Sequence, residues 1–347
     1  MSDYIRMLSP DDARAMAQVD ALLASTGIRR DPHLDAVCGM FDDDGELVAT
    51  GSCFGPTLRC LAVSNERQGE GLMNQIIGRL TELQLERGNT HLFLYTKPQS
   101  ARFFGDLGFY EIARVPGKLV FMENRRTGFR GWVNGLPRAD APRERTAAVV
   151  MNANPFTLGH RWLLEQACAE ADAVHLFVLS ESFGPIPAAD RLRLVREGAA
   201  DLPKLLIHGS GPYIISAATF PSYFLKSGDD VSETHARLDI AVFARIAEAL
   251  GIGLRFVGEE PTSRVTALYN DIMARELPGA GVACRVLPRT RAGGQAISAS
   301  TVRQAVHDGM LEAVRDMLPE PTWRYLTGPE GAKAVAAIRA MDEVRHH

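Results

Sequence analysis

Two short motifs contain residue types suited to binding and activating a nucleoside triphosphate. The first reads N-P-F-T-L-G-H over residues 154–160, shortly after the apolar run Ala147–Met151. A strand that ends in a tight turn and leads into a helix presents free backbone N–H groups to an anion, and Gly159 lets the backbone approach a phosphate closely. His160 stands at the start of that helix, where its side chain can donate to the α-phosphate while charge develops there.

The second motif reads I-S-A-S-T-V-R over residues 297–303. It predicts another helix N-terminus, at which Ser298 and Ser300 contribute hydroxyl groups and also act as caps. Arg303 contributes a planar guanidinium, whose paired hydrogen bonds to phosphate a Lys cannot reproduce. Either motif alone is weak evidence, since His160 can simply cap backbone and Arg303 can be a solvated helix residue. Both motifs together, in this order, predict an enzyme that transfers adenylyl groups from ATP.

Four segments together resemble the citrate lyase ligase family. They are V-M-N-A-N-P-F-T-L-G-H-R at 150–161, G-P-Y-I-I-S-A-A-T-F-P-S-Y-F-L-K at 211–226, V-G-E-E-P at 257–261, and the motif at 297–303. The segment at 211–226 is specific to that family, whereas the first and last segments are shared across the H-x-G-H nucleotidyltransferase superfamily. The resemblance covers nearly the whole chain. It implies an enzyme that uses ATP and acetate to acetylate the prosthetic-group thiol of citrate lyase acyl carrier protein, through acetyl-adenylate, with release of AMP and pyrophosphate.

The resemblance also predicts which residues form the site. His160, Thr157, Arg303 and Lys226 are expected to be catalytic; Thr157 stands where many superfamily members carry a second His, and its hydroxyl can still donate to phosphate. Mg²⁺ is expected to arrive with ATP, and no histidine or cysteine has metal-ligand spacing, so no metal ligands are assigned. The residues expected to bind ATP are Asn152, Asn154, Phe156, Gly159, Arg191, Gly258, Glu259, Ile297, Ser298 and Ser300.

Several of these residues have an ordinary structural alternative. The Thr157 hydroxyl can bond within its own turn. Glu259 and its neighbour Glu260 end an apolar strand, where an acidic pair often caps a helix or is solvated. Arg191 can form a surface pair with Asp190. Within the family-specific segment, Lys226 would neutralise the charge of triphosphate or acetate. Core packing is the preferred role of the residues before it, Tyr223, Phe224 and Leu225.

Downstream of residue 146, apolar runs alternate with helical patterns. Strands separated by helices predict βαβ units and a doubly wound, Rossmann-like parallel sheet covered on both faces. A ligand of such a sheet lies beyond the carboxyl ends of the strands, which is where the T-L-G-H turn falls. The expected strands are Ala147–Met151, Val174–Leu179, Leu205–His208, Leu254–Val257 and Val282–Leu287, and the expected helices are His160–Glu170, Ala188–Ala199, His235–Leu250, Val265–Glu276 and Ser300–His307.

Upstream, a different pattern predicts an α+β domain. The segments V-S-N-E-R-Q-G-E-G-L-M at 63–73 and A-R-F-F-G-D-L-G-F-Y at 101–110 resemble the GCN5-related N-acetyltransferase fold. Gln68 and Gly71 match that fold's pyrophosphate-binding pattern and are expected to bind the pantetheine-like arm of the carrier protein, although Met73 departs from the pattern. The expected helices are 10–26, 71–87 and 100–107, and the expected strands are 37–41, 47–53, 57–63 and 91–95, followed by further strands.

The expected organisation is therefore an acyl- or pantetheine-binding domain over 1–134, a linker over 135–145 that is rich in Pro and charge, and a nucleotidyltransferase domain over 146–347. The composition is 46% hydrophobic and 23% charged, as in ordinary globular proteins, and the net charge of −4 argues against a nucleic-acid partner. Five cysteines without C-x-x-C spacing indicate free thiols. Neither a signal peptide nor a membrane-spanning run is recognisable, so a cytoplasmic enzyme without a membrane partner is expected.

Two other functions remain open from the sequence. The shared outer motifs allow an adenylyltransferase that acts on a phosphate ester of the pantetheine-phosphate or nicotinamide-nucleotide type, although the family-specific segment argues against it. The N-terminal pattern allows an acetyl-CoA-dependent N-acetyltransferase whose C-terminal domain senses a nucleotide. The products formed from ATP and acetate distinguish these functions from the ligase.

Overall fold

The computed structural model describes residues 3–181, 184–216, 219–225, 228–259, 264–292 and 294–341. The chain forms two compact units. Unit 1 consists of Met1–Gly128 together with Pro221–Thr234, and unit 2 consists of Phe129–Phe220 together with His235–His347. This division differs from the expected one, because its first border falls at residue 128 instead of within 135–145, and because unit 1 takes a second stretch from the middle of the chain.

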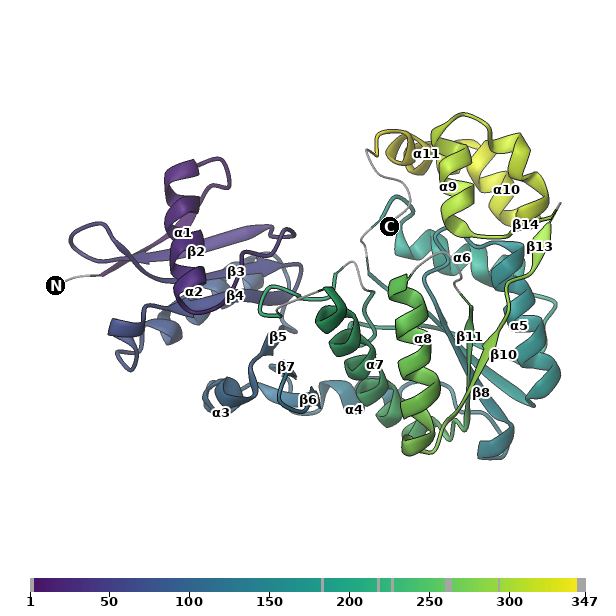
Figure 1. The fold of residues 1–347 in the computed structure, drawn as a ribbon, viewed down its shortest axis with the longest axis horizontal. Coiled ribbons are helices and arrows are strands. Elements are labelled where there is room, and N and C mark those ends of the chain that lie inside the picture. Colours follow the sequence, from purple (N-terminus) through teal and green to yellow (C-terminus); the bar gives the residue numbers. More distant parts are fainter. Residues whose placement is uncertain are drawn as a thin grey trace. The chain divides into compact units, whose positions relative to one another are not determined.

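Unit 1 is built on a mixed seven-stranded sheet with strand order β1-β2-β3-β4-β5-β7-β6 (Figure 1). Strands β1 to β4 pair antiparallel in succession, and β4 pairs parallel with β5 over only two residue pairs. This arrangement confirms the expected α+β class, with β1 as an additional strand. The strands are β1 (Tyr4–Leu8), β2 (Ala36–Phe41), β3 (Leu47–Phe54), β4 (Thr57–Val63), β5 (Phe93–Thr96), β6 (Tyr110–Val115) and β7 (Leu119–Glu123), and the helices are α1 (Ala13–Ser25), α2 (Leu72–Glu86) and α3 (Ala101–Asp106).

Helices α1 and α2 bury their apolar stripes in two separate clusters of unit 1. Helix α1 begins at the N-cap Asp12, whose carboxylate accepts from the backbone N–H of Ala15 at 3.0 Å. Helix α2 packs closely on β3 because Gly51 has no side chain; a Cβ atom there would lie 2.6 Å from Ile76. The start of α2 requires Gly71, whose φ of +76° is a left-handed conformation that glycine adopts without strain.

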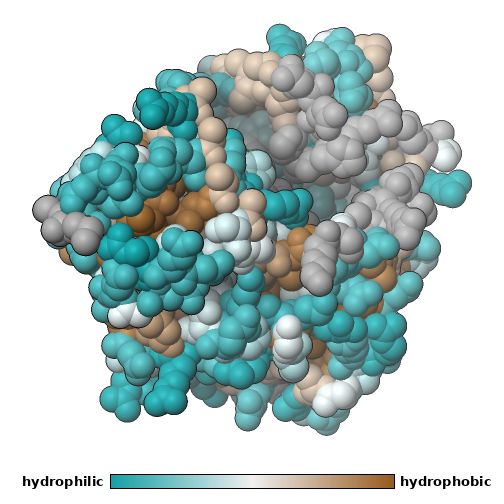
Figure 2. Space-filling view, turned by 60° about the vertical axis from the view of Figure 1, so that its left-hand side comes forward, coloured by the Kyte–Doolittle hydropathy of each residue, from teal (hydrophilic) through white to brown (hydrophobic). Residues whose placement is uncertain are grey.

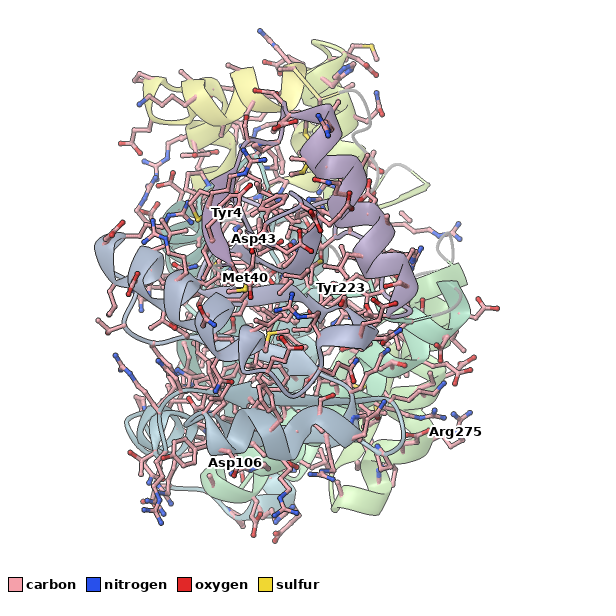
Figure 3. All side chains as sticks on the ribbon, turned by 90° about the vertical axis from the view of Figure 1, so that its left-hand side faces the viewer. Tyr4, Met40, Asp43, Asp106, Tyr223 and Arg275 are labelled. Atoms are coloured by element: carbon pink, nitrogen blue, oxygen red, sulfur yellow. The ribbon has the colours of Figure 1, made fainter. Side chains whose placement is uncertain are left out.

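Tyr223 belongs to the core of unit 1, although it lies far along the chain. Its side chain is 5% exposed and packs in the cluster that includes Val19 and Leu23 of α1 and Cys60 of β4. Figure 3 shows Tyr223 beside α1. The expectation that this part of the family-specific segment packs in a core is confirmed for Tyr223, but the core is that of unit 1.

Unit 2 is a doubly wound α/β domain, as expected. Its five strands are all parallel and have the order β10-β9-β8-β11-β12, so the order reverses at β8. The strands are β8 (Thr146–Met151), β9 (Ala173–Val178), β10 (Leu205–Gly209), β11 (Leu254–Gly258) and β12 (Ala283–Leu287), and a hairpin of β13 (Arg291–Ala292) and β14 (Gln295–Ala296) follows. The apolar runs of the sequence thus mark the central sheet to within about one residue.

The helices that accompany this sheet include all five expected ones. They are α5 (Leu158–Glu170), α6 (Ala188–Gly198), α7 (Gly228–Leu250), α8 (Arg264–Glu276) and α9 (Ala299–His307); α4 (Gly128–Asn134), η5 (Leu311–Met317), α10 (Glu320–Thr327) and α11 (Ala332–Arg339) were not expected. Helix α7 starts seven residues before the expected His235, and its first turns belong to unit 1. Helices α9, α10 and α11 gather at one end of unit 2, coloured yellow in Figure 1.

The surface is predominantly polar on the face drawn in Figure 2, where hydrophobic side chains lie mostly in recesses between hydrophilic ones. Within the described ranges, none of the helices has the length and apolar character needed to cross a membrane.

Candidate active site

The predicted site residues converge on a cavity of about 360 Å³ in unit 2. It lies beyond the carboxyl ends of β8, β11 and β12, beside the point where the strand order reverses, as expected for a ligand of this fold. Lys226 and Glu260 lie outside the described residues. The predicted residues that line the cavity are Asn152, Asn154, Thr157, Gly159, His160, Gly258, Glu259, Ile297, Ser298, Ser300 and Arg303.

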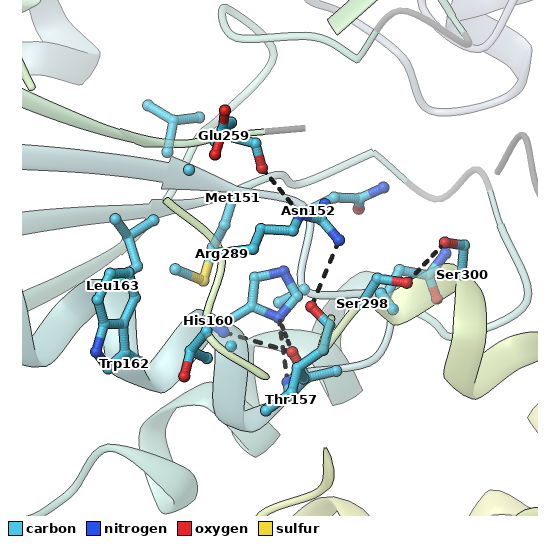
Figure 4. Close-up of a pocket in the computed structure, with 18 of the residues that line it drawn as sticks. Met151, Asn152, Thr157, His160, Trp162, Leu163, Glu259, Arg289, Ser298 and Ser300 are labelled. Atoms are coloured by element: carbon cyan, nitrogen blue, oxygen red, sulfur yellow. Dashed lines mark hydrogen bonds between the residues drawn. The ribbon is translucent and has the colours of Figure 1, made fainter. Parts of the chain in front are cut away.

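His160 is held by the first turn of α5. Thr157 is the N-cap: its hydroxyl accepts from the His160 backbone N–H at 3.4 Å, and its own backbone N–H donates to Nδ1 of His160 at 3.1 Å. A ring nitrogen that accepts from an N–H carries a lone pair, so this geometry assigns the ring proton to Nε2. Figure 4 shows the second ring nitrogen pointing away from Thr157. The imidazole therefore offers one N–H donor on its cavity side.

The charge state of His160 follows from its surroundings. Its pKa is lowered to about 4, first because burial disfavours the charged ring, and second because Arg289 and Arg303 are nearby cations. The ring is therefore neutral near pH 7 in the free protein. Its contribution is a directed hydrogen bond, and the positive charge of the cavity comes from the two arginines.

Gly159 allows α5 to approach the segment that leads into α9. A Cβ atom at this position would lie 3.2 Å from the carbonyl oxygen of Ile297 and 3.3 Å from its side chain. Phe156 lies behind the cavity wall and is fully buried; its ring stacks on that of His160 at 5.9 Å between centroids. Both residues therefore fix the geometry of the α5 turn.

The N-terminus of α9 forms another side of the cavity. Ser298 is its N-cap, and the hydroxyl accepts from the backbone N–H of Thr301 at 3.0 Å. The hydroxyls of Ser298 and Ser300 lie 2.9 Å apart, as drawn in Figure 4. Ser298 is thus a cap, as expected in either interpretation, and Ser298, Ala299 and Ser300 line the cavity at the start of the helix. Two helix N-termini converge here, and each favours an anion.

Arg303 and Asn154 combine a buried cation with a buried amide. Arg303 is 3% exposed and donates from Nη1 to the carbonyl oxygen of Asn154 at 2.6 Å. Burial lowers the pKa of Arg303 to about 10, so the guanidinium stays charged near pH 7. The side-chain amide of Asn154 is buried, and neither its nitrogen nor its oxygen has a hydrogen-bond partner among the described residues. Such a group costs about 1–3 kcal/mol, which a polar ligand in the cavity would offset.

Arg191 is fully buried and does not line the cavity. It donates to the backbone carbonyl of Asn152 at 2.9 Å and also to the side-chain oxygen of that residue. Further donors reach the carbonyl oxygens of Ile186 and Glu181. The alternative surface pair of Arg191 with Asp190 is absent among these contacts, and Asp190 accepts from the Tyr325 hydroxyl instead. Arg191 therefore positions Asn152 in the cavity wall from behind.

Arg289 is a cavity residue that the sequence analysis missed. It donates from Nε to the carbonyl oxygen of Glu259 at 2.9 Å and from Nη1 to that of Ile297 at 3.4 Å. In Figure 4 it extends across the wall near His160. Arg289 follows the carboxyl end of β12, so the rule that ligands lie beyond the strand ends could have found it. Trp162, in the first turns of α5, also lines the cavity and was not predicted.

Other residues considered from the sequence lie elsewhere. His175 and His208 form a buried pair with 2.9 Å between ring nitrogens, and the described part of the chain contains no cluster of metal ligands. The five cysteines are free thiols, and burial raises the pKa of Cys38 and Cys53 to about 11. Gln68 and Gly71 are exposed at the start of α2 in unit 1.

Comparisons with known proteins decide the family. A family model described as the citrate lyase ligase C-terminal domain matches residues 146–326. The citrate (pro-3S)-lyase ligase of Escherichia coli K12 is 36% identical over 331 residues, which are 94% of this chain and 94% of the relative. The chain belongs to the citrate lyase ligase family.

Two further relatives carry the same name. The protein from Klebsiella pneumoniae is 39% identical over 81% of this chain and 83% of the relative. The protein from Haemophilus influenzae is 33% identical over 91% of this chain and 96% of the relative. Members of this citrate lyase ligase family are acid–thiol ligases, so this chain is an enzyme of that class. The two alternative functions left open by the sequence are not favoured.

Solved structures resemble about a third of the chain. An acyl-CoA N-acyltransferase from Pseudomonas aeruginosa is 13% identical, covers 36% of this chain and 100% of its own, and has a TM-score of 0.31. Escherichia coli ElaA is 15% identical, covers 36% and 100%, and also has a TM-score of 0.31. Likeness at this level assigns no activity to unit 1.

Proposed function

We propose that this member of the citrate lyase ligase family uses ATP and acetate to acetylate the prosthetic-group thiol of the citrate lyase acyl carrier protein, and thereby activates citrate lyase. One observation carries the proposal: in a member of this family, two helix N-termini, Arg289 and Arg303 surround a single cavity. A carboxylate can approach a triphosphate only where their mutual repulsion is screened, and this cavity supplies that screening.

In the first half-reaction, an acetate oxygen attacks the α-phosphorus of ATP. The bond from that phosphorus to the oxygen bridging to the β-phosphate breaks. Pyrophosphate is the leaving group, and acetyl-adenylate is the product. This step needs no covalent enzyme group, so the chain acts by orientation and charge stabilisation. We assign Nε2–H of His160 to an α-phosphate oxygen, and Arg303, Arg289 and the N-terminus of α9 to the other two phosphates.

Thr157 acts in this scheme through His160. Its side chain is 1% exposed, and its hydroxyl and backbone N–H are both engaged with His160. It therefore fixes the tautomer and the direction of the ring. Lys226 retains its predicted role in neutralising triphosphate or acetate charge.

The cavity wall fits ATP in its polar groups. The amide of Asn154, which has no hydrogen-bond partner within the described ranges, provides both a donor and an acceptor. The carbonyl and carboxylate oxygens of Glu259 lie at the end of the neighbouring strand β11. Mg²⁺ usually binds through phosphate oxygens, waters and one or two carboxylates. Glu259 is the carboxylate among the described wall residues, so it would hold a Mg²⁺ that enters with ATP and neutralises phosphate charge.

In the second half-reaction, the carrier thiol attacks the acetyl carbonyl carbon. The bond from that carbon to the AMP oxygen breaks, AMP leaves, and the thiol proton is released. A thiol with a pKa near 8.5 is mostly protonated at neutral pH, so the thiolate needs an electropositive site or a base. We assign binding of the prosthetic arm to Gln68 and Gly71, which are exposed at the start of α2.

The test is acetate-dependent exchange of labelled pyrophosphate into ATP by the purified chain alone. The ligase catalyses this exchange without the carrier protein, and forms AMP and an acetyl thioester when the carrier is added. Formation of a nucleotide-linked product, or release of CoA from acetyl-CoA without ATP consumption, would overturn the proposal in favour of one of the two other functions.

A further inference from the structure

Trp162 in α5 differs from the other two tryptophans of the chain in its surroundings. The Trp132 ring packs against Tyr213 with 4.9 Å between ring centroids, and the guanidinium of Arg315 lies 5.0 Å from the ring centre of Trp323. Trp162 is half-buried and lines the cavity of unit 2. Within the described ranges, neither an aromatic ring nor a cation lies against its indole, and its N–H has no acceptor. The cavity wall therefore offers a ligand both a flat aromatic face and a hydrogen-bond donor.

Trp162 lies on the side of the cavity away from the start of α9. Figure 4 shows Trp162 and Leu163 on one side of His160, and Ser298 and Ser300 on the other. Leu163 also lines the cavity, with a side chain that is only 8% exposed. The two sides thus differ in chemistry, because one presents aromatic and aliphatic groups and the other presents hydroxyls and a helix N-terminus.

The order of the groups in ATP matches this arrangement. The proposed function places the α-phosphate at His160 and the other two phosphates at the N-terminus of α9. Since the α-phosphate joins adenosine to those two phosphates, adenosine extends from His160 in the direction away from α9. That direction leads to Trp162. Adenine is a flat ring system, and such bases stack on aromatic side chains.

We propose that Trp162 binds the adenine base of ATP by stacking, and that it thereby contributes to the choice of nucleotide. The inference rests on the proposed function, because it takes the position of the triphosphate from it. An indole that faces a solvent-filled cavity keeps apolar area in water, and a purine that covers the ring removes that area from water. A pyrimidine covers less of the ring, so stacking on Trp162 favours ATP over CTP.

The experiment measures the binding of AMP and of pyrophosphate to the full chain by titration calorimetry. These two ligands separate the adenosine end of ATP from its phosphate end. In Trp162→Ala, the dissociation constant of AMP rises about tenfold, which is the scale of one stacked base, while that of pyrophosphate changes by less than about twofold. The KM for ATP in acetate-dependent pyrophosphate exchange rises to a similar extent, and the preference for ATP over CTP falls. Trp162→Phe keeps an aromatic ring, so its constants for AMP and ATP increase less.

Tryptophan fluorescence provides a second measurement that does not depend on activity. A base stacked on an indole changes the emission of that indole, so AMP changes the emission of the wild type. Trp162→Phe abolishes this change, although AMP still binds in calorimetry. Trp323→Phe is the matched control, since Trp323 is also half-buried, belongs to the same unit and does not line the cavity. It keeps the change in emission and both dissociation constants.

Three results would overturn the inference. One is an unchanged dissociation constant of AMP in folded Trp162→Ala, and another is an AMP-dependent change in emission that persists in Trp162→Phe. The third is an equal loss of AMP and pyrophosphate binding, which a merely structural role of Trp162 predicts. If Trp162→Ala does not fold, Trp162→Phe supplies both the calorimetric and the fluorescence comparison.

The two proposals fail in different ways. A wild type that binds AMP through Trp162 but shows no acetate-dependent exchange would overturn the proposed function alone. Normal exchange in the wild type, with AMP binding that does not respond to the loss of Trp162, would overturn the role of Trp162 alone.

Discussion

Substitutions of His160 can separate its two roles at the start of α5. Its Nδ1 accepts from the backbone N–H of Thr157 at 3.1 Å, which supports the cap, whereas Nε2–H is the donor on the cavity side. In His160→Asn, the amide oxygen can take the place of Nδ1, but nothing replaces the cavity donor. In His160→Gln, the longer side chain brings an amide N–H near the position of Nε2. His160→Ala removes both functions.

The expected effects follow from these contacts. Loss of one preorganised donor to a developing charge lowers kcat by about 10²–10³-fold, or roughly 3–4 kcal/mol. Loss of an N-terminal cap interaction lowers the free energy of unfolding by about 1 kcal/mol. We therefore expect His160→Asn to be slow but nearly as stable as the wild type, His160→Ala to be slow and less stable, and His160→Gln to recover part of the rate.

The assay is acetate-dependent pyrophosphate exchange at saturating ATP and acetate, with urea unfolding measured on the same preparations. Stability corrections matter because a loss of folded protein also lowers the apparent kcat. Exchange by folded His160→Asn within about threefold of the wild-type rate would refute the assignment of Nε2–H to the α-phosphate. Equal rates for the Asn and Gln variants would refute the assigned direction of the donor.

Four further predictions concern other parts of the chain. Arg303→Lys loses the paired geometry and the 2.6 Å bond to Asn154, so the KM for ATP in the exchange assay should rise at least about tenfold; an unchanged KM would contradict a phosphate contact. The free energy of unfolding should fall as pH drops from 6.5 to 4, because burial lowers the pKa of His175 and His208 to about 4 while the unfolded chain binds protons from about pH 6.5. Urea titrations should show a loss of roughly 2–4 kcal/mol for the pair at pH 5. The double variant His175→Gln/His208→Gln should show a weaker dependence on pH. A fragment that starts near Arg143 should aggregate, because it exposes Tyr223 without unit 1, and Tyr223→Ser should improve its solubility in sedimentation; a well-folded parent fragment would count against the observed division. Gly71→Asn keeps the backbone, because Asn tolerates a φ of +76°. It should raise the KM for the carrier in acetyl transfer and leave pyrophosphate exchange unchanged. Equal losses in both assays would indicate a folding defect.

The central sheet and its first motif were predictable because their signals are local. The apolar run before Asn154 marks β8, and the turn that follows provides Thr157 and Gly159 in the positions that an N-cap and a close helix contact require. The same holds for Ser298, which is a cap by residue type and position. Parallel order then follows from alternation of strands and helices, and places both motifs at one edge of the sheet.

The roles of Arg191 and Tyr223 were not predictable, since they depend on contacts between distant parts of the chain. Arg191 lies near the start of a helix, and its sequence context does not distinguish it from a helix arginine that reaches a phosphate. In the structure, its partners are the carbonyl oxygens of Asn152, Glu181 and Ile186. Tyr223 lies in the stretch Pro221–Thr234, which interrupts unit 2 in the sequence, and only the fold shows that its ring belongs with Val19 and Leu23. Local periodicity contains no information about such pairings.

The late helices show a different limit. Residues 311–339 form short helices interrupted by Pro319, Gly328 and Pro329, and such interruptions hide the helical period over the few turns available. They are nevertheless fixed by tertiary contacts, for example the hydroxyl of Thr322, which donates to the carbonyl oxygen of Phe156 at 2.9 Å. Packing against the α5 turn therefore decides their structure more than their own propensity.

The discontinuity of unit 1 sets an order of events on the ribosome. Residues up to 128 are synthesised well before Tyr223, and at about 5–20 residues per second the interval is roughly 5–20 s. During this time the apolar cluster that contains Val19 and Leu23 lacks the Tyr223 side chain that packs in it in the folded protein. The unit that is translated first is thus completed only after much of unit 2 has emerged.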